Sequence, residues 1–285
     1  SWQSLYPFTG KRIDLGGYNM HYLDEGAGET VLMVHGNPTW SFYFRTLVKA
    51  LSPTHRCIVP DHIGMGLSDR PDDSRYRYTL KSRVDDLEKL MDRIAPKGPV
   101  TLVLHDWGGM IGMSWAVRHP ERIKAIAALN TSCFRLPPEK NFPGTLSLLR
   151  GAVSGIPMRL SRRARRRILE TCTAKKLSPE VADGYLSVCD GWSESRALHR
   201  FVQDIPLSPG DPAWETIVET ESKLGVFKNT PMLLPWGMKD WVFDAAFLNG
   251  WLRRFPNAEA RRFADCGHLL LEDAPKAAAE LIRGF

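Results

Sequence analysis

Residues 99–109 read PVTLVLHDWGG, an apolar run that ends in a polar corner and two glycines. A continuous apolar run is typical of a strand buried on both faces of a parallel sheet. The following residues, 107–118, favour a helix. A sharp strand-to-helix turn at this place exposes one side chain above the sheet, and here that side chain is Asp106. Asp106 is therefore a candidate nucleophile, although an aspartate before a helix is also an ordinary N-cap.

Strand-like and helix-like segments alternate on both sides of this corner. The predicted strands are residues 11–15, 18–24, 30–36, 56–60, 99–105, 123–130, 230–237 and 258–265. The predicted helices are residues 40–51, 79–95, 107–118 and 273–284. This alternation predicts an α/β fold with a mostly parallel, doubly wound sheet.

The stretch from residue 131 to residue 225 interrupts this pattern. It is rich in proline, arginine and serine, and it contains short helical segments but no clear buried strand. The strand pattern returns after it. We therefore predict a core made of residues 1–130 and 226–285, with residues 131–225 inserted as a helical cap.

Composition excludes several classes of protein. With 43% hydrophobic and 25% charged residues, the 285-residue chain resembles a globular domain rather than a disordered or fibrous protein. No apolar run approaches the roughly 18 residues of a membrane-spanning helix, and residues 1–13 lack the apolar stretch of a signal peptide. The five cysteines are widely spaced without a CxxC pair, so we expect no disulfides, no metal site and a cytoplasmic location.

Positive charge is concentrated in the predicted cap. Residues 150–176 contain nine basic residues and one glutamate, whereas the whole chain has a net charge of only +6. No nucleic-acid-binding motif accompanies this cluster, so we expect no nucleic-acid partner. Because five arginines in six positions cannot all be buried and paired, we expect residues 162–167 on the outer surface of the cap, outside the active site. The alternative is that this basic cluster contacts an anionic surface or a partner.

Two further polar motifs follow predicted strands. Asn37 lies in HGNP at 35–38, at the carboxyl end of a strand, where α/β proteins bind ligands. Such a turn is common in loops, but the amide of Asn37 also offers two donors to an anion. His268 lies in DCGH at 265–268, after the last predicted strand.

An acid that orients His268 has three candidates. Asp240, Asp244 and Asp265 all lie near the last two predicted strands. Asp240 is preferred because it ends the loop that follows the strand at 230–237. The chain order Asp106, Asp240, His268 is then the nucleophile–acid–histidine order of enzymes built on a nucleophile elbow.

These motifs together resemble the haloalkane dehalogenases of the α/β-hydrolase superfamily. HGNPTW at 35–40, HDWGG at 105–109 and DCGH at 265–268 carry the resemblance, which covers nearly the whole chain and is weakest in the cap. It implies an α/β-hydrolase fold without metal or organic cofactor. By position, Asp106 is similar to the family's nucleophile, His268 to its base and Asp240 to its acid. Asn37 and Trp107 are similar to its halide-binding pair.

The pattern is most similar to the third subfamily of that family. Residues 123–134 contain no acid where another subfamily carries a glutamate. PDHIGMGLSD at 60–69 and the segment after it resemble the third subfamily and also the related β-lactone decarboxylase of bacterial olefin biosynthesis. That subfamily tends to self-associate, which makes a homo-oligomer a candidate assembly.

The resemblance predicts hydrolysis of a carbon–halogen bond through an alkyl ester of Asp106, with a small apolar halogenated or lactone molecule as substrate and halide as product. β-Lactone decarboxylation is the first alternative, because it needs the same residues. It would also need a long apolar tunnel. Epoxide hydrolysis is the second, but it needs a proton donor for the alkoxide, and Tyr185 is the sole tyrosine between 131 and 229. A binding protein on a hydrolase scaffold would lack one of Asp106, Asp240 and His268, and none is missing.

Overall fold

The computed structural model describes residues 1–96, 98–151, 153 and 156–285. Its centre is an eight-stranded sheet in the order β1-β2-β4-β3-β5-β6-β7-β8. β1 and β2 pair antiparallel, as do β2 and β4, and the remaining neighbours pair parallel. The strands are β1 Lys11–Asp14, β2 Asn19–Glu25, β3 Glu29–Val34, β4 His55–Pro60, β5 Val100–Asp106, β6 Ile123–Thr131, β7 Met232–Gly237 and β8 Glu259–Phe263. The predicted α/β fold with a mostly parallel sheet is confirmed.

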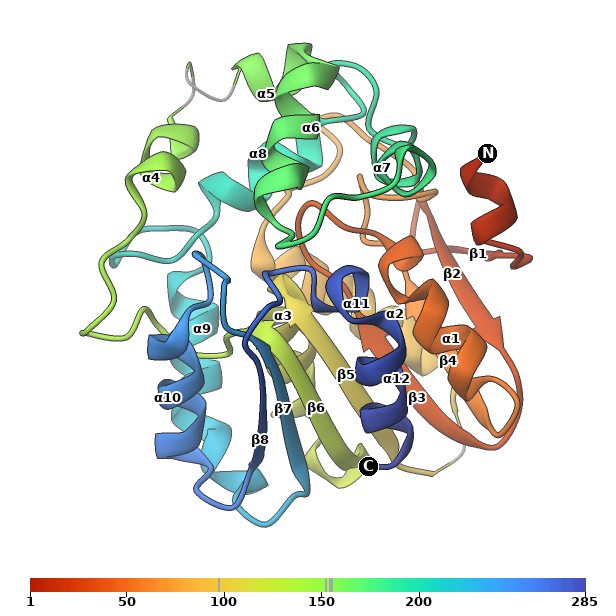
Figure 1. Ribbon diagram of the computed structural model, residues 1–285, viewed down its shortest axis with the longest axis vertical. Coiled ribbons are helices and arrows are strands. Elements are labelled where there is room, and N and C mark those ends of the chain that lie inside the picture. The colour runs from red at the N-terminus through yellow and green to blue at the C-terminus, as the bar shows by residue number, and fades with distance from the viewer. Residues whose placement is uncertain (97, 152, 154–155) are drawn as a thin grey trace.

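Helices cover both faces of the sheet. α1 (Arg45–Leu51) packs against α12 (Pro275–Arg283), and α2 (Leu80–Ile94) packs against α3 (Trp107–Ala116). Figure 1 shows the first pair in front of the sheet and the second behind it. The central strands β3, β5 and β6 are buried almost throughout, which explains why they are continuous apolar runs rather than alternating ones.

α2 illustrates how the sequence builds a helix of the core. Thr79 caps its first turn by accepting a hydrogen bond from the backbone N–H of Ser82. The buried residues include Leu80, Val84, Leu87 and Met91, which is the apolar stripe expected of a helix that covers a sheet. The helix α10 (Ala245–Arg254) was not predicted, although Asp244 caps its first turn.

The residues between β6 and β7 form mainly helices. These are α4 Gly144–Arg150, α5 Ile156–Leu160, α6 Arg162–Thr171, α7 Pro179–Leu186, α8 Arg196–Gln203 and α9 Trp214–Lys223. In Figure 1, α4 to α8 lie beyond the carboxyl ends of the parallel strands, whereas α9 packs against α3. We therefore propose to narrow the expected cap, residues 131–225, to the part that carries α4 to α8. α11 (Leu270–Asp273) lies between this part and α12.

The expectation that residues 162–167 all lie outside the active site was wrong. Arg165 is buried and donates hydrogen bonds to the carbonyls of Met158 and Arg159 and to Asp190. Arg165 and Arg167 both line the large cavity described below. The reason is helical periodicity, because a run of six residues passes around more than one turn and cannot face one side only.

All five cysteines of the chain are buried and free. No helix in the described part of the chain is long and apolar enough to cross a membrane.

Candidate active site

Asp106 stands at the corner between β5 and α3 with φ of +53°. A left-handed backbone is strained for a residue with a Cβ, and it persists where the surrounding structure enforces it. Here the enforcement comes from close packing, since a Cβ on Gly36 would lie 2.0 Å from Oδ1 of Asp106. A Cβ on Gly108 would lie 1.9 Å from the carbonyl oxygen of Val34. Only glycine fits at these two positions, which explains why Gly36 occurs in HGNP and Gly108 in HDWGG.

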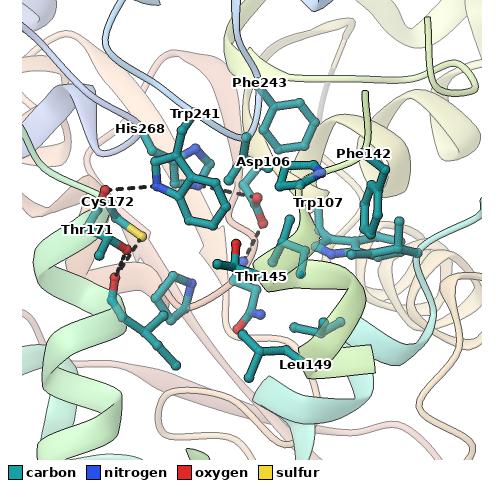
Figure 2. Close-up of a pocket in the computed structure, with 18 of the residues that line it drawn as sticks. Asp106, Trp107, Phe142, Thr145, Leu149, Thr171, Cys172, Trp241, Phe243 and His268 are labelled. Atoms are coloured by element: carbon teal, nitrogen blue, oxygen red, sulfur yellow. Dashed lines mark hydrogen bonds and ion pairs between the residues drawn. The ribbon is translucent and has the colours of Figure 1, made fainter. Parts of the chain in front are cut away.

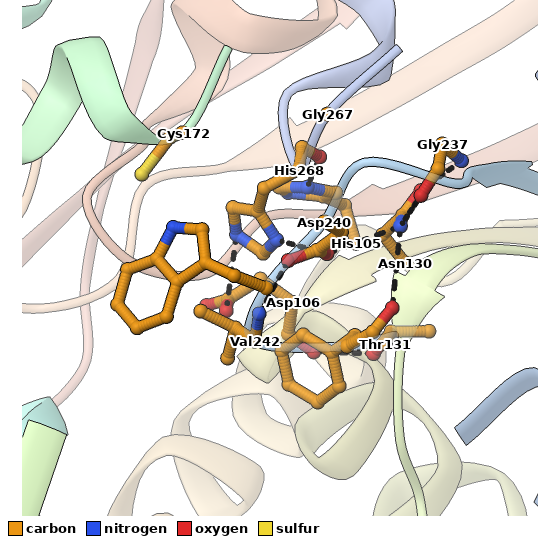
Figure 3. A network of polar contacts seen from close by, with 12 residues as sticks. His105, Asp106, Asn130, Thr131, Cys172, Gly237, Asp240, Val242, Gly267 and His268 are labelled. Atoms are coloured by element: carbon orange, nitrogen blue, oxygen red, sulfur yellow. Dashed lines mark hydrogen bonds and ion pairs between the residues drawn. The ribbon is translucent and has the colours of Figure 1, made fainter. Parts of the chain in front are cut away.

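The structure brings Asp106, His268 and Asp240 together from three separate parts of the chain (Figure 3). Nδ1 of His268 lies 2.8 Å from Oδ2 of Asp240, and Nε2 lies 3.3 Å from Oδ2 of Asp106. All three side chains are buried. One nitrogen of the imidazole is therefore held by Asp240, and the other is directed at Asp106, the candidate nucleophile.

The two carboxylates also set the charge of the histidine. Burial alone would disfavour its cationic form, but Asp240 and Asp106 together raise the pKa of His268 well above its ordinary value. Ester formation at Asp106 would remove one of these two negative charges. The pKa of His268 would then fall, so that its Nε2 becomes available as a base after the first chemical step.

Asn130 is a residue of the candidate site that the sequence analysis missed. Its Nδ2 lies 3.0 Å from Oδ2 of Asp240, and its Oδ1 accepts a hydrogen bond from the backbone N–H of Gly237. The backbone N–H of Val242 donates to the other oxygen of Asp240 at 2.7 Å. Asp240 is therefore held by two donors besides His268, and both fix the orientation of its carboxylate.

Asp244 and Asp265, the other two candidates for the acid that orients His268, make different contacts. Asp244 caps α10 and pairs with Lys140. The side chain of Asp265 is 86% exposed and pairs with Lys239 on the surface. Neither is bonded to His268, which favours Asp240 as the acid.

The two predicted anion-binding residues flank Asp106. The backbone N–H of Asn37 donates to Oδ1 of Asp106 at 2.5 Å, and its side-chain amide donates to the carbonyl of Leu198 in α8. Within the described residues, the indole N–H of Trp107 forms no hydrogen bond, and Trp107 lines the cavity (Figure 2). Trp107 thus offers a free donor beside the nucleophile, whereas one donor of Asn37 already holds the cap.

A cavity of about 720 Å³ opens above Asp106 and His268. Most of its wall is apolar, and the wall comes from the core as well as from the cap. The apolar lining includes Met110, Phe134, Leu136, Phe142, Leu146, Leu149, Met158, Ile168, Leu198, Val202, Ile205, Leu207, Val242, Phe243 and Phe247. Its volume lies in the range of sites for drug-sized ligands, and it suits a molecule with long apolar groups.

Asp273 connects residues 174–175, which follow α6, to the loop that carries His268, and no pattern in the sequence indicates this role. Its carboxylate accepts hydrogen bonds from the backbone N–H groups of Gly267 at 2.7 Å, Ala174 at 2.9 Å and Lys175 at 2.9 Å. The side chain is buried. One carboxylate therefore satisfies three backbone donors from two segments that are far apart in the sequence.

Replacing Asp273 with alanine would leave these donors without a partner. We expect Asp273→Ala to lower the free energy of unfolding by about 2–4 kcal/mol and to lower kcat, because His268 follows Gly267 directly. Asp273→Asn keeps one acceptor oxygen and should lose less of both. Chemical denaturation and steady-state kinetics measure the two effects. The control is Ser178→Ala, which removes the cap of α7 and should cost only about 1 kcal/mol; equal losses in both variants would contradict this role of Asp273.

Comparison with known proteins identifies the family of the chain. Residues 29–275 match the family model described as alpha/beta hydrolase fold, and the chain belongs to this family. The chain is 46% identical to a cis-3-alkyl-4-alkyloxetan-2-one decarboxylase of Shewanella oneidensis, over 99% of this chain and 89% of the relative. It is 31% identical to haloalkane dehalogenase 2 of Mycobacterium tuberculosis, over 99% of this chain and 96% of the relative.

A solved structure is similar over almost the same length. The haloalkane dehalogenase DbeA from Bradyrhizobium elkani aligns with a TM-score of 0.86 and 25% identity, covering 97% of each chain. The predicted resemblance to haloalkane dehalogenases and to the β-lactone decarboxylase is therefore confirmed. The decarboxylase relative has the higher identity, so dehalogenation, our main functional prediction, is consistent with these findings but not preferred.

Proposed function

We propose that this enzyme decarboxylates β-lactones that carry two alkyl groups, cis-3-alkyl-4-alkyloxetan-2-ones, to alkenes. Two observations support the proposal. The relative with this activity is 46% identical over 99% of the chain. The apolar cavity of about 720 Å³ above Asp106 supplies the room that two alkyl chains need, and it is the observation that carries the proposal.

In the first step the carboxylate of Asp106 attacks C4 of the lactone ring. A new bond forms between Oδ2 of Asp106 and C4, the ring bond between C4 and the ring oxygen breaks, and C4 is inverted. The leaving group is the substrate's own carboxylate, which needs no proton. The new carboxylate of the substrate replaces the negative charge that Asp106 loses, so in this reaction His268 can remain an imidazolium and stabilise it.

In the second step the bond between C3 and the carboxylate carbon breaks. Its electron pair forms the C3–C4 double bond, CO₂ leaves, and Asp106 departs from C4 as a free carboxylate. No water and no net proton are consumed. Inversion followed by anti elimination converts a cis-lactone into a cis-alkene, so the stereochemistry of the product reports the path.

The experiment that tests this path compares the cis- and trans-isomers of one dialkyl lactone. Gas chromatography should show a cis-alkene from the cis-lactone. Any turnover of the trans-isomer should give the trans-alkene. A mixture of both alkenes from either pure isomer would mean that a free carbanion or carbocation forms, and the proposed path would be wrong.

Haloalkane dehalogenation is the second candidate function. The observation in its favour is the free indole N–H of Trp107 beside Asp106, because a donor without an acceptor suits a halide ion. Asp106 would displace halide and form an alkyl ester. His268, oriented by Asp240, would then activate water against that ester.

The halide site gives a test of this second function. Trp107→Phe keeps an aromatic ring but deletes the indole donor, and we expect it to lose about two orders of magnitude in the rate of halide release. Asn37→Ala should lower the rate of halide release by as much, because it deletes the amide donors of Asn37 and leaves the carbonyl of Leu198 without this hydrogen bond. Halide release from 1-bromobutane and quenching of tryptophan fluorescence by bromide measure the effect. Trp192→Phe, in the outer part of the cap, is the control and should behave like the wild type.

The other two alternatives are less well supported. An epoxide hydrolase needs an acid from the cap, but Tyr185 is buried away from the cavity lining and its hydroxyl donates to Glu272. Glu272 is in turn paired with Arg45. A binding protein would not need His268 placed between the carboxylates of Asp240 and Asp106.

A further inference from the structure

Large apolar side chains are exposed mainly at the outer end of the cap. Leu148 in α4 is 66% exposed, Leu160 in α5 is 67% exposed and Trp192, which precedes α8, is 43% exposed. Figure 1 places α4, α5 and α6 at the end of the molecule opposite the C-terminus. Exposed apolar residues that gather in one region indicate a contact with another molecule or a membrane.

Two arginines on α6 accompany these apolar side chains. Arg163 and Arg167 are exposed and lie one helical turn apart. In the described part of the chain neither forms an ion pair, whereas Arg162, Arg165 and Arg166 all do. Two like charges at this spacing repel each other and destabilise the helix slightly, and an anionic partner would remove this free-energy cost. We call Leu148, Leu160, Trp192, Arg163 and Arg167 the cap tip.

The active-site cavity reaches the surface at the same place. Its exposed lining residues are Thr145 and Leu148 from α4 with Arg167 and Thr171 from α6. Leu148 and Arg167 therefore belong both to the cap tip and to the mouth of the cavity. A molecule that covers the cap tip also covers the entrance to Asp106.

We propose that the cap tip docks on an anionic phospholipid surface, with the mouth of the cavity facing the lipid. Exposed leucine and tryptophan side chains next to arginines are the features by which proteins bind the membrane interface, and arginines near an anionic leaflet add electrostatic attraction. The inference deepens the proposed function and rests on it in one respect. A dialkyl lactone dissolves in lipid far better than in water, and it would enter the cavity directly from the membrane.

A second copy of the chain suits this surface less well. A symmetric dimer brings the same patch of both subunits together, and Arg163 and Arg167 of one copy would then face the same arginines of the other. Like charges brought together in this way oppose association. The charge of the cap tip thus favours an anionic surface over self-association.

The experiment is vesicle sedimentation with the full-length protein and no substrate. One set of vesicles is phosphatidylcholine, and in the other about a third of the lipid is phosphatidylglycerol. The wild type should pellet with the anionic vesicles and not with the neutral ones, and high salt should release it. Because no substrate is present, the result does not depend on whether the proposed reaction occurs.

Matched variants identify the surface that binds. The double variant Arg163→Gln, Arg167→Gln should lower the partition coefficient about 30-fold, since each cation near the membrane contributes about fivefold. The control, Lys228→Gln with Arg283→Gln, removes the same charge from exposed positions outside the cap and should bind like the wild type. Leu160→Ser leaves the charge unchanged and should still weaken binding.

Three results would overturn the proposal. The first is equal sedimentation of the wild type with neutral and anionic vesicles, and the second is an equal loss in the control and cap-tip variants. The third is a dimer in analytical ultracentrifugation that the cap-tip variant abolishes, because the surface would then be an interface between copies of the chain.

Discussion

His268→Ala should release one bromide ion from 1-bromobutane per active site and then stop, provided that the wild type turns this substrate over. Asp106 is a carboxylate without help from a base, so the alkyl ester can form in the variant. The ester cannot be hydrolysed, because the residue that lies between Asp240 and the nucleophile is gone. A serine nucleophile would give no burst at all, since histidine must deprotonate it first.

The same variant should behave differently with a β-lactone. Decarboxylation consumes no water, so we expect His268→Ala to retain slow multiple turnover, reduced by about 10²–10³-fold through loss of the imidazolium donor. Rapid-quench measurement of bromide and gas chromatography of the alkene separate the two cases. A complete block of decarboxylation together with an intact bromide burst would contradict the role assigned to His268 in the lactone reaction.

Asp106→Ala should abolish both reactions, with a loss of about 10⁴-fold or more in kcat, as is usual when a covalent nucleophile is removed. Its carboxylate is the group that would form the bond to carbon, and among the described residues His268 pairs with no acid other than Asp106 and Asp240. Alkene and bromide release measure the loss. The control is Asp265→Ala, because Asp265 is an exposed acid near His268 in the sequence that pairs with Lys239 on the surface. Comparable losses in both variants would place the nucleophile elsewhere.

The sequence predicts the sheet, and the places of the three candidate catalytic residues at its edge, because both depend on local patterns. β3, β5 and β6 are recognisable as continuous apolar runs, and parallel strands bring their carboxyl ends to one edge. Asp106 ends β5, Asp240 follows β7 and His268 follows β8. All three strands run parallel in one sheet, so their carboxyl ends could be expected to bring these residues together. Their catalytic roles remain predictions that the experiments above decide.

The supporting residues could not be predicted in this way. Asn130 and Asp273 act through hydrogen bonds to backbone groups about a hundred residues away, and no local pattern reports such a partner. The arginines of α6 were misjudged for a different reason. Their number suggested a solvated surface, but the helical turn directs Arg165 inward, and a helical projection of residues 162–171 would have revealed this.

The size of the cavity could not be predicted from the sequence either, because it depends on how α4, α6 and α8 pack over the core. This feature matters for the choice between the two functions. The three candidate catalytic side chains suit a short haloalkane as well as a dialkyl lactone, and the space above them favours the larger substrate.

The most direct test of the proposed function is incubation of the purified protein with a long-chain cis-3-alkyl-4-alkyloxetan-2-one. Alkene, CO₂ and any β-hydroxy acid are then measured in the same sample. We predict one cis-alkene and one CO₂ for each lactone consumed, with kcat/KM at least about a hundredfold above that for 1-bromobutane, since the apolar cavity can bind both alkyl chains. Formation of the β-hydroxy acid, or no consumption of lactone by folded protein that releases bromide, would contradict the proposal.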